Sequence, residues 1–573
     1  MAYCCVPLCK SDEKKKIAGI SFHEVPSDLE LRQKCFVMSG LSTSYRIPVG
    51  YFFTKGLTGA QLHELVLFIM KKVETCGFRI TRLVTDNHKV NVHAFKLLGY
   101  GCLTYRIEHP CDPERPLFLS FDPCHVLKNV RSQFLAHDIG PKGEISSSHL
   151  KAVYELQKDL TVRPVRYLSR KHVYPNNIEK MNVGRAVQVL SPAVTAALEH
   201  LKEQAGHTCS VSFASAGPSI TFMKYIYRWF VLHDTSNTTQ HLRQNFADAR
   251  HYDDVDDDRL EWLEATMPMY LEDLKKRCSH PKEFLTKETY EAFLITTYST
   301  VACIKYLLSI EKFSFVLTRK FNSDPIESLF GTLRMSSGCN DTLDVRAALS
   351  GLEKVLKTGI AASNALSNVA HSETAGISTA LLRKIPAEQV QPRSEIAKSA
   401  MTVLERLNTT LLPLHLPSLQ ISATVYIGGY IARVIMEQMN CENCVALCTK
   451  PVTNQPLLTF TRSQDRGGLL YPSYQLLFVL DALRTFAEQA LKENHALEKP
   501  LTSLVERAVP ALCGSNLLKC KDSDEPHRLK LMELISVRFL RPLLSNYAFS
   551  VTDKHDAYRY FAKKPLSRKC LKL

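Results

Sequence analysis

The stretch Ile80-Thr-Arg-Leu-Val-Thr-Asp86 decides the fold prediction, because a β-branched, apolar segment ends there in a carboxylate that is followed by Asn87. Such a composition predicts a strand. Upstream, Val49-Gly-Tyr-Phe-Phe53 predicts another strand, and between the two the apolar residues from Leu62 to Val73 recur at helical spacing. The sequence therefore predicts a strand, a helix and a second strand in succession.

The alternation continues to about residue 136. Residues 90–98 predict a second helix, and Pro116-Leu-Phe-Leu-Ser-Phe-Asp122 predicts a third strand. The helix that follows carries apolar residues on one side, namely Val126, Leu127, Val130 and Phe134. On that helix we expect Lys128 and Arg131 to face water or phosphate. Alternating strands and helices favour a largely parallel sheet.

Beyond residue 136 the strand signals fade and helical patterns replace them. We expect helices in an all-helical block at about 178–204, 258–276 and 283–311, then in a second block from Asp324 to Leu356. A Ser-, Ala- and Thr-rich segment at 361–400 predicts a loose link, and residues 401–573 are again mainly helical in pattern.

Composition bounds the class of protein. The 573 residues are 45% hydrophobic and 23% charged, which excludes wholesale disorder. The apolar runs are interrupted before the ~18 residues that a membrane span needs, and Met1–Lys16 has no hydrophobic signal core, so we expect no membrane partner. With 72 Lys and Arg against 57 Asp and Glu, the net charge of +15 favours an anionic partner, nucleic acid first.

The 18 cysteines are too few for a disulfide scaffold and indicate a reducing compartment. Cys441-x-x-Cys444 with Cys448 has the spacing of metal ligands, but a second pair is not evident. We expect buried helical thiols there, with a metal site as the alternative.

Two acidic positions each allow two interpretations. Asp86 ends a predicted strand, where ligands and metals gather in open α/β sheets, but Asp also favours turns and helix caps. Asp324-Pro-Ile-Glu327 predicts a capping box that opens a helix. Glu327, one turn into that helix, is alternatively directed at a metal, and both interpretations can hold together.

The order of three motifs resembles the P-element type of DNA transposase, the group that includes the THAP-domain transposases. These motifs are Val84-Thr-Asp86-Asn87, Phe121-Asp122-Pro-Cys-His125-Val-Leu-Lys128-Asn129-Val-Arg131, and Asn322-Ser-Asp324-Pro-Ile-Glu327-Ser-Leu-Phe-Gly331. Three further motifs resemble the C-terminal region of the family: Tyr426-Ile-Gly-Gly-Tyr430, Cys441-x-x-Cys444, and Asp465-Arg-Gly-Gly-Leu469 with Pro472-Ser473.

The resemblance implies an α/β fold: an RNase H-like core interrupted by an all-helical GTP-binding insertion, with a helical C-terminal region and a partial zinc-finger remnant at the N-terminus. It implies two Asp and one Glu around Mg²⁺ or Mn²⁺, with Asp86 matching the second Asp and Glu327 the Glu. Asp324 matches the residue that faces the guanine base of GTP. Asp122 and His125 match a family motif to which we assign no chemical role.

The first catalytic Asp of the family has no counterpart here, since no Asp or Glu lies between Phe36 and Thr54. Two metal ions about 3.5–4 Å apart need a bridging carboxylate for in-line attack on a phosphodiester. We therefore expect the first strand of the core to be missing and strand cleavage to be lost. A sheet without that strand would also expose an edge.

The N-terminal segment resembles the beginning of a THAP zinc finger. Cys5 and Cys9 match its first zinc ligands, with Cys4 as an alternative to Cys5, but the later Cys-x-x-His pair is absent and Cys35 is the only nearby substitute. Zn²⁺ is thus expected only if the finger is completed. Both losses fit one stretch removed between Lys34 and about Ile47, by deletion, alternative splicing or a mis-joined gene model.

The expected organisation has six parts: a partial finger at 1–36, the N-terminal part of the core at 37–136, the insertion at 137–318, the C-terminal part of the core at 319–360, a linker at 361–400 and a helical region at 401–573. Three hypotheses stay open: an active cut-and-paste transposase, a non-cleaving derivative that binds DNA and GTP, and a non-catalytic interaction scaffold. Expected partners are DNA, GTP and further copies of the chain or related transposases, in the nucleus.

Overall fold

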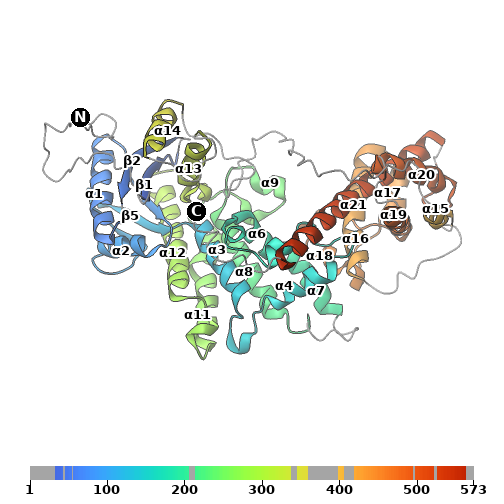
Figure 1. Ribbon diagram of the computed structural model, residues 1–573, viewed down its shortest axis with the longest axis horizontal. Coiled ribbons are helices and arrows are strands. Elements are labelled where there is room, and N and C mark those ends of the chain that lie inside the picture. Colours follow the sequence, from blue (N-terminus) through green and yellow to red (C-terminus); the bar gives the residue numbers. More distant parts are fainter. Residues whose placement is uncertain are drawn as a thin grey trace. The chain divides into compact units, whose positions relative to one another are not determined.

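The structure is a computed structural model that describes residues 32–42, 45–54, 56–204, 213–336, 345–358, 398–405, 418–453, 455–493, 497, 499–521 and 525–562. Cys5, Cys9 and almost all of the expected linker at 361–400 lie outside these ranges. The chain divides into two compact units (Figure 1). The first comprises Met1–Gly143, Lys180–Val187 and Tyr225–Thr379, and the second Glu144–Glu179, Gln188–Lys224 and Ala380–Leu573.

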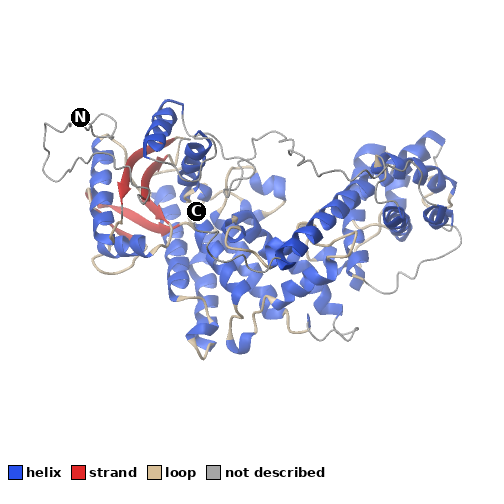
Figure 2. Ribbon diagram, viewed as in Figure 1, coloured by secondary structure: helices blue, strands red, loops and turns tan. Residues whose placement is uncertain are grey.

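All the described strands belong to the first unit and form two sheets (Figure 2). Strands β1 (Arg32–Ser39) and β2 (Arg46–Thr54) make an antiparallel hairpin. The second sheet has the order β3-β5-β4 and contains β3 (Arg82–Thr85), β4 (Arg106–His109) and β5 (Asp112–Phe121). Strands β3 and β5 are parallel, whereas β4 and β5 are antiparallel.

The expectation of a largely parallel sheet is wrong, because only one of the three strand pairs is parallel. Two residues, Pro110 and Cys111, connect β4 to β5, and so short a connection permits only an antiparallel pair. The predicted strands at 49–53, 80–86 and 116–122 are confirmed in position. Strands β1 and β4 were not predicted, and β1 crosses the boundary expected at residue 36.

Helices cover the sheets of the first unit (Figure 1). Helix α1 (Gly59–Thr75) starts with a capping box in which the Thr58 side chain accepts from the N–H of Gln61, and α2 (Lys89–Leu98) packs against α1. Helix α3 (Pro123–Ala136) follows β5 directly, and α12 (Lys287–Ser309) packs on both.

Two further helices, α13 (Asp324–Ser336) and α14 (Val345–Thr358), pack on the β1–β2 hairpin. They share with it a buried apolar core made of Tyr51, Leu329, Leu333, Ala348, Leu352 and Val355. Further helical segments with residues in this unit are α6 (Val183–Leu190), α8 (Gly217–His233), α9 (Gln240–Gln244), α10 (Asp258–Glu261), the π-helical segment Trp262–Thr266 and α11 (Met267–Arg277). Helices α6 and α8 also have residues in the second unit.

The expectation that Lys128 and Arg131 face water or phosphate is wrong. Lys128 is 6% exposed and Arg131 is fully buried, with its guanidinium donating to the carbonyl of Lys180 at 2.5 Å. The reason is that the segment around Lys180 covers Arg131, and Lys128 points toward the His125 side chain.

The described secondary structure of the second unit is helical, apart from isolated bridge residues. Its helices are α4 (Ser148–Gln157), α5 (Arg170–Val173), α7 (Pro192–Gln204), α15 (Lys398–Glu405), α16 (Leu419–Met439), α17 (Glu442–Cys448), α18 (Thr459–Arg462), α19 (Tyr474–Glu493), α20 (Pro500–Gly514) and α21 (Glu525–Ala562). Residues from α15, α16, α17, α19, α20 and α21 form one apolar core. The predicted change from strands to helices after residue 136 is confirmed for the described residues.

Two of the C-terminal motifs have a structural role. A Cβ added to Gly429 of α16 would lie 2.1 Å from the carbonyl oxygen of Leu470, so only glycine permits this approach. The facing loop is fixed by Asp465, whose carboxylate accepts from the N–H groups of Gly467 and Gly468 at 2.9 and 3.1 Å. Although burial raises the pKa of Asp465, these hydrogen bonds outweigh it and hold the pKa below its ordinary value.

Two described helices, α12 and α16, are long and apolar enough to cross a membrane. In each, 61% of the apolar window is buried inside the protein, as in the core helices of globular domains.

Arg82 of β3 connects three elements of the first unit. Its guanidinium donates to the Ser120 hydroxyl on β5 at 2.7 Å, and to the Ser299 carbonyl and Thr300 hydroxyl on α12 at 3.0 and 2.9 Å. It also lies 4.4 Å from the centroid of the Phe321 ring, just before α13. Burial lowers the pKa of this guanidinium, so its hydrogen bonds must compensate for the lost hydration.

We predict that Arg82→Met destabilises this part of the first unit. Losing one hydrogen bond from a charged group costs about 1.5–3 kcal/mol, which corresponds to at least roughly tenfold faster amide exchange in β3 and β5. Hydrogen exchange with mass spectrometry on the full chain measures this rate. Arg79→Met is the matched control, because Arg79 is 58% exposed and pairs with Glu311 at the surface. Equal exchange in the two variants would contradict the role given to Arg82.

Candidate functional site

Asp86 follows the last residue of β3 and shapes the turn into α2. Its Oδ1 accepts from the N–H of His88 at 3.0 Å and from Nδ2 of Asn91 at 2.6 Å. The turn interpretation of Asp86 is therefore confirmed. The carboxylate remains half-buried and lines a cavity, so the turn also fixes its position at the end of the strand.

The cavity measures about 660 Å³ and lies within the first unit. Residues 35–39 of β1 and 82–85 of β3 line it, together with apolar side chains of α1 and α2 and residues 320–330 at the start of α13. Among the described strands, β1 pairs only with β2 and β3 only with β5. Each of the two strands that line the cavity therefore has an edge without a described partner strand.

Two residues of the cavity lining, His125 and Glu327, lie close to the buried Asp122. Nε2 of His125 lies 3.1 Å from Oε1 of Glu327 and 3.8 Å from Oδ2 of Asp122. One potential ligand atom from each residue lies within 4.8 Å of the other two. Residues about 200 positions apart in the chain, on α3 and α13, are thus brought together.

The local sequence explains this convergence. Asp122 caps α3 by accepting from the N–H of Cys124, which places His125 in the first turn of that helix. The other Asp122 oxygen accepts from the Ser323 hydroxyl at 2.9 Å, and Ser323 directly precedes α13. The fully buried Asp122 carboxylate therefore joins the start of α3 to the start of α13.

The acids of this cluster favour a protonated His125, whereas the charge of Lys128 opposes it. Burial lowers the pKa of His125, but the hydrogen bond to Glu327 and the charge of Asp122 outweigh it, so the pKa lies above its ordinary value. Burial raises the pKa of Glu327, but the hydrogen bond to His125 and the charge of Lys128 hold it below its ordinary value. The Lys128 ammonium lies 3.4 Å from Nε2 of His125.

The capping box predicted at Asp324-Pro-Ile-Glu327 is wrong in its register. Helix α13 begins at Asp324 itself, and the N–H of Glu327 bonds to the carbonyl of Ser323. The reason is that Asp324 is drawn to Arg319, 3.5 Å away, which also lies 3.7 Å from Asp234. Burial raises the pKa of Asp324 to about 7, against the opposing charge of Arg319.

The structure places both predicted metal-binding acids, Asp86 and Glu327, on the lining of one cavity. Among the described residues of this unit, however, those grouped as possible metal ligands are Asp122, His125 and Glu327. Asp86 is not part of this group. In the sequence, Asp122 and His125 form an Asp-x-x-His motif directly after a predicted strand. This spacing indicates the group, although we assign the motif no chemical role from sequence.

Cys35, the substitute ligand considered for the zinc finger, lies on β1 and packs against the core around Tyr51 and Leu329. Burial raises the pKa of its thiol to about 12. In this core Cys35 behaves as an apolar group.

The donor set defines the chemistry that this site can support. Two carboxylates and an imidazole suit one divalent cation. Two cations in line need a carboxylate between them, and the segment of β1 that lines the cavity, Cys35–Ser39, contains none. Asp122, His125 and Glu327 could therefore hold one divalent ion.

We predict that Glu327 sets the protonation of His125. The raised His125 pKa contributes stability that is present below pH 6.5 and is lost as pH rises through the folded-state pKa, whereas the lowered Glu327 pKa contributes stability that is lost as pH falls below 4.5. Histidine NMR of the full chain, assigned with His125→Gln, should give a His125 midpoint above 6.5 that falls in Glu327→Gln. Glu311→Gln, which changes another acid on the cavity wall, should leave it in place; equal shifts in both variants would contradict the pairing.

Comparisons with known proteins match three parts of the chain in order. Residues 20–99 match the family described as "TNP-like, RNase H N-terminal domain", residues 124–248 the "TNP-like, GTP-binding insertion domain", and residues 415–547 the "DNA transposase THAP9, C-terminal domain". The first match starts ahead of the core boundary expected at residue 37, and the second starts ahead of the insertion boundary expected at residue 137.

Two curated relatives are similar to parts of the chain. It is 19% identical over 331 residues to the Transposable element P transposase of Drosophila melanogaster, covering 57% of this chain and 42% of that protein. It is 25% identical over 168 residues to the DNA transposase THAP9 of Homo sapiens, covering 28% of this chain and 18% of that protein. The matches thus span less than half the length of either relative.

Among solved structures, the Drosophila P element transposase strand transfer complex aligns with a TM-score of 0.48 at 18% identity, covering 56% of this chain and 69% of that chain. The family rests instead on the three domain matches, which fall in one chain in the order that the sequence motifs indicated, and on the two curated relatives. The chain belongs to the P-element-type family of transposases.

Proposed function

We propose that this chain is a nuclear, transposase-derived protein that binds DNA and GTP but does not cut DNA strands. The observation that supports the loss of cleavage is the cavity lined by Asp86 and Glu327. The part of β1 that lines this cavity contains no carboxylate. Family membership supports an origin in DNA transposition, and the net charge of +15 supports binding to a polyanion.

The proposed loss of strand cleavage rests on the absence of a carboxylate that would bridge two metal ions. Glu327, with His125 and Asp122, would hold one Mg²⁺ or Mn²⁺, and Asp86 would face it from the end of β3. A single ion can orient a phosphate, but activation of the attacking oxygen and stabilisation of the leaving oxygen are divided between two ions in this chemistry. Without the bridging acid, the second ion has no ligand set in this cavity.

The division of the strands into two sheets supports a missing central strand. A strand lying between β1 and β3 would pair with the free edge of each and fill the cavity that both line. The β1–β2 hairpin occupies residues 32–54, where we expected the removed stretch. The removed stretch between Lys34 and about Ile47 stays a prediction, because a hairpin over these residues does not exclude a junction within them.

We predict that the purified full chain with Mg²⁺ or Mn²⁺ does not nick DNA that carries its matching transposon end. Gel analysis of end-labelled DNA measures strand cleavage. The control is the double variant Asp86→Asn with Glu327→Gln, because any nicking that survives in it comes from contaminating nucleases. Cleavage by the wild-type chain above the level of this control would contradict the proposal and favour an active transposase.

DNA binding itself is tested on the same protein by its salt dependence. Each phosphate neutralised by Lys or Arg releases a counterion, so affinity should fall linearly with salt on a logarithmic scale. Weak binding that does not change with salt would favour the alternative of a non-catalytic interaction scaffold.

GTP binding is proposed through Asp324, whose carboxylate would accept from the N–H groups of guanine. Its side chain retains 14% exposure, and the base would compete with Arg319 for it. Because its pKa is raised to about 7, Asp324 is largely protonated at pH 6 and largely ionised at pH 8. A protonated carboxyl loses part of its acceptor capacity, so guanine recognition should weaken as pH falls.

We predict that GTP, but not ATP, raises the melting temperature of the full chain, and does so more at pH 8 than at pH 6. Asp324→Asn should abolish the difference between the two nucleotides. Asp234→Asn is the matched control, because Asp234 shares Arg319 with Asp324, and this variant should keep the preference. Absence of a GTP-specific shift in the wild type, or equal loss in both variants, would contradict direct recognition by Asp324.

A further inference from the structure

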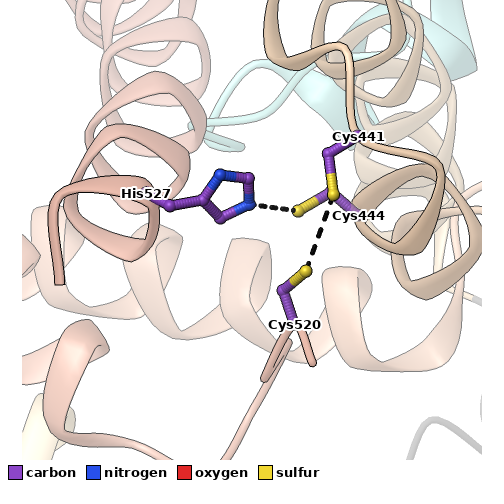
Figure 3. Close-up of side chains that lie close together, drawn as sticks. All are labelled: Cys441, Cys444, Cys520 and His527. Carbon is purple, nitrogen blue, oxygen red and sulfur yellow. Dashed lines mark hydrogen bonds between the residues drawn. The ribbon is translucent and has the colours of Figure 1, made fainter. Parts of the chain in front are cut away.

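Four metal-ligating side chains meet in the second unit: Cys441, Cys444, Cys520 and His527 (Figure 3). Sγ of Cys441 lies 3.6 Å from Sγ of Cys520, and Sγ of Cys444 lies 3.1 Å from Nε2 of His527. All four ligand atoms lie within 4.8 Å of one another. The group is separate from the acidic cluster, which belongs to the first unit.

Three segments of the chain contribute these residues. Cys441 is the N-cap of α17, and Cys444 lies in the first turn of that helix. Cys520 comes from the connection between α20 and α21, and His527 lies in the first turn of α21. The Cys-x-x-Cys spacing at a helix start directs both sulfurs to one side, which is the spacing found in structural zinc sites.

We propose that these four residues bind one structural Zn²⁺. With Zn–S bonds of about 2.3 Å and a Zn–N bond of about 2.0–2.1 Å, a regular tetrahedron places sulfurs about 3.8 Å apart and sulfur and nitrogen about 3.5 Å apart. The observed separations of 3.6 and 3.1 Å are close to these values. Four protein ligands leave no open position, so the ion would hold the fold together and would not catalyse a reaction.

A disulfide is the main competing state for two of the thiols. Its S–S bond is about 2.05 Å long, whereas the Cys441 and Cys520 sulfurs are 3.6 Å apart. Bonding these two would also leave the buried Cys444 and the half-buried His527 without the ion that their convergence fits. Zinc satisfies all four groups together.

The surroundings hold the ligand segments in place. Cys444 and Cys520 are buried in the apolar core of the second unit. Arg528, next to His527, donates to the carbonyls of Cys513 and Ser515 at 2.8 and 2.5 Å and so fixes the end of α20 against the start of α21. Lys530 donates to the carbonyl of Gln438 at 3.4 Å, which ties α21 to the end of α16 just ahead of Cys441.

Cys448 provides a comparison within the same helix. It lies one turn beyond Cys444 on α17, it is equally buried, and it belongs to the same core, but it is not one of the four clustered residues. Losing its sulfur should therefore disturb the packing without removing a metal ligand.

The test is the zinc content of the full chain, purified under reducing conditions and measured by elemental mass spectrometry. Cys444→Ser and Cys520→Ser should each contain roughly one zinc per chain less than the wild type. Cys448→Ser should keep the wild-type content, which separates ligand loss from a general effect of serine in the core. The difference between variants also removes any contribution from the N-terminal cysteines or the acidic cluster.

A second measurement covers the case in which the ligand variants fail to fold. Wild-type protein refolded with Co²⁺ in place of Zn²⁺ should show the visible bands of tetrahedral cobalt together with thiolate charge-transfer absorption, and Cys448→Ser should show the same spectrum. Equal zinc in the wild type and both ligand variants, cobalt without thiolate bands, or a Cys441–Cys520 disulfide in the reduced preparation would each overturn the proposal.

Discussion

The buried guanidinium of Arg82 is the interaction on which the acidic site depends. It joins β3 to β5 and α12 by hydrogen bonds, and it stacks on Phe321 immediately ahead of α13. Since Asp86 directly follows β3 and Glu327 lies in the first turn of α13, this one side chain lies beside both segments that carry the acids. Asp122 makes the second connection, through Ser323. Two residues of opposite charge thus bring together chain segments separated by more than 200 residues.

Around this centre, the first unit brings together Asp122, His125 and Glu327, which could hold a divalent ion, and we propose that the site does not hold two. His125 lies close to both Asp122 and Glu327, which together raise its pKa despite its burial. Strand β1 forms the cavity wall where a carboxylate bridging two ions would be needed. Its residues 35–39 are Cys, Phe, Val, Met and Ser, and none of them is acidic. Family origin and the proposed loss of cleavage are compatible, because the fold of a transposase depends on its packing, whereas its activity depends on a few carboxylates.

The sequence was sufficient where local pattern determines structure. The apolar segments of β2, β3 and β5 and the helical spacing of α1 and α2 were predicted, and Asp86 forms the turn expected of it. The sequence pattern did not predict β1, which begins with the polar run Arg32-Gln-Lys34. It also did not predict the four-residue β4, whose pairing depends on a turn. It failed again at Arg131, because burial was decided by other chain segments that cover α3.

A single sequence could not predict which side chains far apart in the chain come together in the fold. The spacing of Cys441 and Cys444 was visible, but Cys520 and His527 follow so far along the chain that no local spacing connects them. The same holds for His125 and Glu327, whose contact requires both helices to start at the same place. At Asp324 the predicted capping box does not form, and the carboxylate lies near Arg319 in the segment just ahead of α13.

The central claim is that the cavity between β1 and β3 lacks the ligands for a pair of metal ions. Anomalous scattering from crystals of the full chain grown with Mn²⁺ measures this directly, because it locates each manganese without reference to activity. We predict no more than one manganese peak at Asp122, His125 and Glu327. Two peaks about 3.5–4 Å apart, with a carboxylate between them, would contradict the claim.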